Sequence, residues 1–188
     1  MKELLSRVPL AANEQVELVD LQKHNQLARS QITAHRQQKY NLQQNQCLIV
    51  MDFSKFYVEA GKTSDLLLVL YWKTEENKLT WTYLDQFASE QQNFTFVQAV
   101  WLHLFEETTH FNKFNEIFIW SDGGPNHFKI KKTLKFFGDC RMKYDKMITY
   151  NFFASCHGHS ICDSHTGVGK QKILREERAA QFLLCVHK

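Results

Sequence analysis

The chain has 188 residues, of which 44% are hydrophobic and 13% are aromatic, a size and composition that suit one globular domain with a substantial core. No apolar run approaches the roughly 18 residues that cross a bilayer, and the N-terminal stretch MKELLSRVPLAANEQ is too interrupted for a secretory signal. Five cysteines without regular spacing fit a reducing compartment better than a disulfide framework. We therefore expect an intracellular protein outside the membrane. Its net charge of +3 permits a polyanionic partner without requiring one.

The N-terminal third, rich in glutamine, predicts one long polar helix from about residue 14 to residue 44. Leu18, Leu21, Ala28 and Ile32 recur at near-helical spacing among strong helix formers. Because this apolar stripe is thin, it favours a helix that lies across the domain or pairs with a partner over one that contacts nucleic acid. We place the boundary between this segment, residues 1–46, and the main domain, residues 47–188, at the change in composition.

Three strands are predicted next, over residues 47–53, 66–73 and 79–86. CLIVMDF is a short apolar run typical of a strand buried on both faces, and the two later runs are rich in β-forming residues. The turn-prone sequence TEEN separates the second run from the third. These three strands should form an antiparallel meander.

The rest of the chain alternates between helix and strand. We expect helices over 94–111, with Asn93 as N-cap, and over about 127–137 and 163–186, and strands over 116–124 and 147–155. Right-handed crossovers would place the fourth and fifth strands parallel to the first, in a mixed sheet with helices on both faces. The order β-β-β-α-β-α-β-α is the arrangement of a ribonuclease H-like α/β fold with a five-stranded sheet.

Two aspartates end predicted strands of this sheet. If the strands that carry Asp52 and Asp122 are parallel neighbours, their carboxylates leave the same edge side by side. Such a pair repels unless a cation lies between its members, and oxygen ligands suit Mg²⁺ or Mn²⁺. A third acid, Asp163, opens the last predicted helix. Three carboxylates from these positions would hold two metal ions for in-line attack on a phosphodiester.

Three motifs carry a resemblance to a known class of protein. DFSKFY (52–57), SDGGPNHFK (121–129) and HGHSICD (157–163) resemble the DFSxxY, SDGxxxxFK and HGxxxxD motifs of the DDE/D transposase catalytic core in transposon-derived eukaryotic proteins. The similarity covers about residues 47–175. It implies a metal-dependent nuclease or polynucleotidyl transferase of the nucleus, with transposon ends and target DNA as partners. It also implies that His157 points at the metals or the scissile phosphate.

Each of these residues also has a structural interpretation. Asp52 could end a strand, Asp122 could be a turn residue of SDGGP, and Asp163 could cap a helix. The loop that holds Cys156, Cys162 and His165 could bind zinc, but structural zinc sites join two separated knuckles, so zinc is disfavoured. Lys129, Lys131 and Lys132 are candidate phosphate contacts or, alternatively, a solvated helix face.

A second class of function stays open beside the nuclease. The fold could persist as a catalytically inactive, domesticated module that binds nucleic acid or protein, because no zinc finger or helix-turn-helix precedes Asp52. The chain ends inside the last predicted helix, so we expect it to be part of a longer protein. A homo-oligomer is compatible with either function.

Overall fold

The computed structural model describes residues 12–58, 61–88, 92–109, 111–123, 128–154, 162, 164–169 and 171–172. The elements in chain order are α1 (Ala12–Tyr40), β1 (Gln46–Val58), β2 (Gly61–Lys73), β3 (Leu79–Ala88), α2 (Phe94–Glu106), β4 (Glu116–Asp122), α3 (Lys131–Lys143) and β5 (Met147–Phe153). Residues 162, 164–169 and 171–172, called here the C-terminal helical residues, are also helical. None of the helices among the described residues is long and apolar enough to span a bilayer.

The strands form one mixed sheet in the order β3-β2-β1-β4-β5. β1 pairs antiparallel with β2, and β2 antiparallel with β3, which confirms the predicted meander. β4 pairs parallel with β1, and β5 parallel with β4, as predicted. The predicted ribonuclease H-like arrangement is therefore correct.

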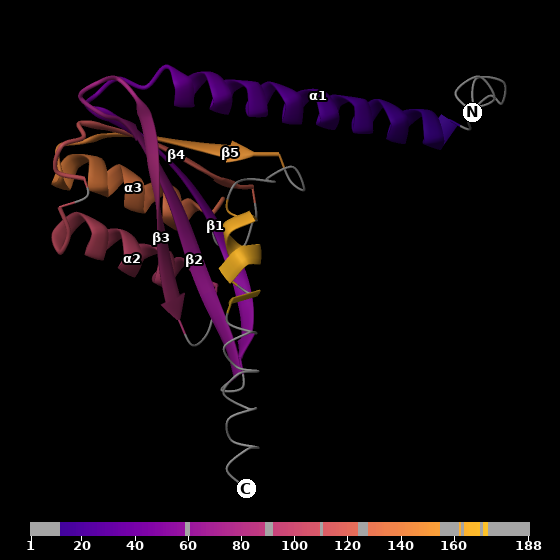
Figure 1. Ribbon diagram of the computed structural model, residues 1–188. Coiled ribbons are helices and arrows are strands. Elements are labelled where there is room, and N and C mark those ends of the chain that lie inside the picture. The colour runs from indigo at the N-terminus through magenta and orange to yellow at the C-terminus, as the bar shows by residue number, and fades with distance from the viewer. Residues whose placement is uncertain are drawn as a thin grey trace, which may run out of the picture.

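The sheet separates two apolar clusters, because side chains alternate between its faces along each strand. Cys47, Ile49 and Met51 face a cluster built with α2 and α3. Leu48 and Val50 face the other way, into a cluster that includes Trp120, Phe153 and Cys162. Figure 1 shows α2 and α3 on one side of the sheet and the C-terminal helical residues, in yellow, on the other. We call this second side the Cys162 face.

The second half of α1 packs on the Cys162 face near β4 and β5. The ring of His35 meets the rings of Trp120 and Phe153 edge-on, with centroids 5.4 and 5.3 Å away, and Trp120 Nε1 donates to Gln38 Oε1 at 2.7 Å. Burial, with help from Lys39 and Arg36, lowers the pKa of His35 to about 4. His35 is therefore neutral at neutral pH, which suits its aromatic surroundings.

The first strand is longer than predicted. β1 continues beyond residue 53 to Val58 because it keeps pairing with β2 as far as the Val58 and Gly61 pair. Asp52 therefore lies within β1 rather than at its end, which corrects the sequence prediction. Its partner strand on the other side, β4, ends at Asp122, so the five-stranded part of the sheet stops close to Asp52.

Two helices also have boundaries other than those predicted. The helix expected over 127–137 begins only at Lys131 because Phe128 is fully buried and stacks on Phe53, with ring centroids 5.2 Å apart. It continues to Lys143 because Cys140 extends its buried face. The helix expected to reach residue 111 ends at Glu106, whereas its predicted N-cap is confirmed: Asn93 accepts a hydrogen bond from Phe96 N at 3.0 Å. The last predicted helix lies outside the described residues beyond 172.

Candidate functional site

Asp52 and Asp122 come together at the parallel junction of β1 and β4. The last pair in the ladder between these strands is Met51 with Ser121, so the two aspartates are the next residue on each strand. Alternation places both side chains on the Cys162 face, where Val50 and Trp120 are buried. Neighbouring strands are roughly 4.8 Å apart, a spacing that lets two carboxylates share one cation. The structure therefore brings two of the predicted acids together.

The oxygens of these two carboxylates differ in their surroundings. Asp52 Oδ1 accepts a hydrogen bond from Phe53 N at 2.8 Å. Asp122 Oδ1 is buried and has no hydrogen-bond partner among the described residues. A buried carboxylate oxygen without a donor is costly unless a cation compensates it. The donor set, two aspartates with one uncompensated oxygen, fits a hard divalent cation such as Mg²⁺ or Mn²⁺.

The third predicted acid, Asp163, and His157 both lie outside the described residues. Their chain neighbour Cys162 is described, and its side chain is 1% exposed within the apolar cluster of the Cys162 face. Within the part of the chain that the structure describes, no three His, Cys, Asp or Glu side chains form a metal-binding group. The structure thus places two of the three acids, and the metal-binding role of all three remains a prediction.

A second polar group on the Cys162 face was not predicted. His165 Nε2 lies 3.1 and 3.0 Å from the two carboxylate oxygens of Asp85 on β3, and its ring stacks on Tyr83 with centroids 4.0 Å apart. Asp85 pairs across the sheet with Leu67, which in turn pairs with Asp52. Asp52, Leu67 and Asp85 are therefore cross-strand neighbours on β1, β2 and β3. The contact between Asp85 and His165 holds the C-terminal helical residues against this part of the sheet.

Asp65 completes this group from β2. It is 0% exposed, accepts from Gln86 N at 3.2 Å, and lies 3.5 Å from Ser54 Oγ. Burial and the neighbouring charge of Asp85 raise the pKa of Asp65 to about 6, against the two hydrogen bonds and the nearby His165. The sequence held a signal for it: Asp65, Leu67 and Val69 share the period of two that places them on one face.

The candidate phosphate-binding lysines lie near the same edge of the sheet. Lys129, Lys131 and Lys132 follow β4 at the end that carries Asp122, and all three side chains are exposed. Lys129 Nζ sits over the ring of Phe152 at 5.5 Å from its centroid. Lys131 and Lys132 open α3, where backbone N–H groups add positive potential. Because α3 packs on the face of the sheet opposite to the paired aspartates, the role of these lysines in phosphate binding remains a prediction.

The residues considered for zinc have other neighbours. Cys156 lies outside the described residues, Cys162 is buried among apolar side chains, and His165 is held by Asp85. Cys47, Cys140 and Cys162 are buried, and none of these three described cysteines is in a disulfide. Burial raises the pKa of the Cys140 thiol to about 11, so that thiol is unreactive at neutral pH.

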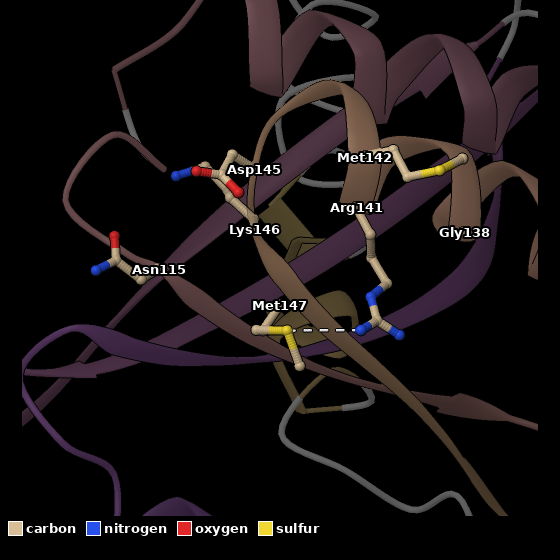
Figure 2. A pocket seen from close by; sticks show the side chains of 7 residues that line it. All are labelled: Asn115, Gly138, Arg141, Met142, Asp145, Lys146 and Met147. Atoms are coloured by element: carbon tan, nitrogen blue, oxygen red, sulfur yellow. Dashed lines mark hydrogen bonds between the residues drawn. The ribbon is translucent and has the colours of Figure 1, made fainter.

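A cavity lies at the opposite end of the parallel strands, where β4 and β5 begin. The cavity has a volume of about 650 Å³, and Arg141 Nη2 donates to Met147 Sδ at 3.5 Å. Figure 2 shows the side chains that line it. Lys146 Nζ donates to the carbonyls of Phe111 and Phe114 at 2.9 and 2.6 Å. Met147 begins β5, whereas the paired aspartates lie toward the ends of the parallel strands. The cavity is therefore separate from the candidate site. It is lined by Asn115, Gly138, Arg141, Met142, Asp145, Lys146 and Met147.

The sheet order and the crossovers define the class of domain: a ribonuclease H-like α/β domain with two aspartates at its parallel junction. The chain belongs to the family described as a domain of unknown function, DUF8701, which matches residues 31–183. No curated protein matches the sequence.

Several chains of solved structures are similar to this chain. One of them is a chain from a cryo-EM structure of a simian T-cell lymphotropic virus intasome in complex with PP2A regulatory subunit B56 gamma, with 12% sequence identity and a TM-score of 0.36. The match covers 74% of this chain and 43% of that chain, so this protein spans less than half the length of that relative.

Proposed function

We propose that the protein is a transposase-like nuclease or polynucleotidyl transferase that cleaves DNA phosphodiesters in the nucleus. The observation that carries this proposal is the position of Asp52 and Asp122, which follow the last pair of the parallel β1–β4 ladder on one face. Two carboxylates delivered in this way suit chemistry at a phosphodiester, where charge must be neutralised. The resemblance of DFSKFY, SDGGPNHFK and HGHSICD to transposase motifs supports the same assignment.

The chain's own residues would bind the metal ions and position the DNA strand. Asp52 and Asp122, together with Asp163, would hold two Mg²⁺ or Mn²⁺ ions, which when bound supply Lewis acidity at the attacking and leaving oxygens. The hydrogen bond from Phe53 N restrains the Asp52 carboxylate. Lys129, Lys131 and Lys132 would bind phosphates on either side of the scissile bond and so orient the strand. His157 would lie near the scissile phosphate.

Metal titration tests this proposal most directly. We would titrate Mn²⁺ into the wild type and into Asp52→Asn, Asp122→Asn and Asp163→Asn by calorimetry, with circular dichroism to confirm folding. Asp139→Asn, an exposed aspartate on α3, is the matched control. Binding should be lost in the three site variants and kept in the control. Wild-type binding in all variants, or no binding at all, contradicts a shared metal site.

DNA assays then separate the nuclease from an inactive binding module. The wild type should nick supercoiled DNA with Mg²⁺ or Mn²⁺, and Asp122→Asn should not. Replacing Lys131 and Lys132 with alanine should lower the salt dependence of DNA binding by about one phosphate contact each. If the protein binds DNA with this salt dependence but binds no metal and never nicks the DNA, it acts as a catalytically inactive DNA-binding module.

A further inference from the structure

The first half of α1 extends beyond the described sheet. Figure 1 shows α1 reaching past β5 and away from the sheet toward the N-terminus. Most residues from Glu14 to Leu27 are exposed, including Val16 (61%), Leu18 (41%) and Leu21 (55%). A helix of this length is marginal in water without packing, since most helical stability in proteins comes from an apolar face in contact with something. Leu18 and Leu21 therefore leave apolar surface exposed in this half.

The exposed leucines continue the stripe by which α1 contacts the sheet. At 100° per residue, Leu18 and Leu21 project from the same side of the helix as Ala28 and Ile32. Ala28 is 2% exposed and His35 is packed on Trp120, so the C-terminal part of this stripe is covered. Val16 and Val19 project from the opposite side. The uncovered surface is thus the Leu18–Leu21 side of the helix.

The charges of α1 are segregated along its length. Its acidic residues Glu14, Glu17 and Asp20 all precede its basic residues Lys23, Arg29, Arg36 and Lys39. Asp20 and Lys23 pair with each other along the helix, with Lys23 Nζ 3.5 Å from Asp20 Oδ1. The helix dipole favours the remaining order only within the first and last turns, so it does not explain Arg29. A helix of this kind is complementary to an antiparallel copy of itself. A parallel copy would place like charges opposite each other.

We propose that α1 pairs antiparallel with α1 of a second copy of this chain, through Leu18 and Leu21. A crossing point between Leu21 and Gln22 places Glu14 of each copy opposite Arg29 of the other. This is a two-fold symmetric contact, in which one surface serves both partners, as in most homodimers. The contact is short, so the dimer dissociates at low concentration.

Sedimentation equilibrium of the full chain over a range of concentrations tests the dimer. The wild type should be a concentration-dependent dimer, and the double variant Leu18→Glu/Leu21→Glu should be a monomer with unchanged far-UV circular dichroism. Val16→Glu/Val19→Glu is the matched control, because it adds the same charges to the other side of the helix and should leave the dimer intact. A wild-type monomer, or a dimer that survives Leu18→Glu/Leu21→Glu, overturns the proposal.

A charge exchange between copies tests the antiparallel register. Positions 14 and 29 are roughly 22 Å apart along one helix, so Glu14 and Arg29 can meet only between copies. Glu14→Lys and Arg29→Glu should each weaken the dimer at least severalfold, because each homodimer then contains two like-charge pairs. An equimolar mixture of the two variants should associate as tightly as the wild type, and this recovery should fade in high salt. If the mixture associates no better than either variant, the antiparallel register is wrong.

Discussion

Replacing Asp65 with asparagine removes a carboxyl group that is buried between β1 and β3. Asparagine matches its shape, and its amide oxygen can still accept from Gln86 N. Its amide nitrogen can donate to Ser54 Oγ, which lies 3.5 Å from the carboxylate in the wild type. The substitution should therefore keep the packing and remove only the ionisation. Any change in stability that depends on pH then reports the carboxyl group itself.

The expected magnitude follows from the pKa of Asp65. Burial raises it from 3.8 to about 6. Below about pH 4 the carboxyl group is protonated in both the folded and the unfolded chain, so its ionisation does not change the free energy of unfolding. As pH rises through this interval the unfolded chain ionises first, so the free energy of unfolding falls, and above about pH 6 the loss is complete. The difference between these two pKa values corresponds to a loss of about 3 kcal/mol at most in the free energy of unfolding.

Urea unfolding followed by tryptophan fluorescence at several pH values measures this effect. Asp65→Asn should match the wild type near pH 4 and be more stable by about 1–3 kcal/mol near pH 8. Asp139→Asn, which replaces an exposed aspartate, is the matched control. A constant difference between Asp65→Asn and the wild type across this range would refute the reasoning, as would a wild type that is the more stable protein near pH 8.

Two further substitutions test the packing and the contact between β3 and the C-terminal helical residues. Trp101 is fully buried against Phe111 and Phe137, so Trp101→Ala should cost about 3–5 kcal/mol in urea unfolding. Trp101→Phe should cost much less, since it keeps aromatic contacts and removes an indole N–H that has no hydrogen-bond partner among the described residues. His165→Ala should cost about 1 kcal/mol, because the side chains of His165 and Asp85 are partly exposed. It should also speed amide exchange in the C-terminal helical residues but not in β1, and adding Asp85→Asn should cost little more; full additivity would contradict the pairing.

Much of the fold could be predicted because each strand has its own local signal. The apolar run around Ile49 and the run around Ile119 are short and uninterrupted, which is typical of central parallel strands. Helical stretches between the later strands then required parallel pairing. The start of α3 could not be predicted, because the helical pattern includes Phe128 and only the tertiary contact with Phe53 removes that residue from the helix.

The candidate site could be predicted in part for the same reason. Asp52 and Asp122 each follow an apolar run, so the topology alone brings them together. The contact between Asp85 and His165 joins residues 80 positions apart, and no local pattern indicates such a pair. Asp65 was overlooked because the strand was predicted to begin after it, at Leu66, whereas β2 begins at Gly61. Long-range polar pairing is thus the part that needed the structure.

The contact between Trp120 and α1 has a spectroscopic consequence. The indole of Trp120 is 4% exposed, donates to Gln38 and lies edge-on to His35, two positions before Asp122. Indole emission shifts to longer wavelength when water replaces such surroundings. Once Trp72, Trp81 and Trp101 are replaced by phenylalanine, the remaining fluorescence reports whether α1 stays docked beside the candidate site. The protein therefore contains its own optical probe for that helix, with no added label.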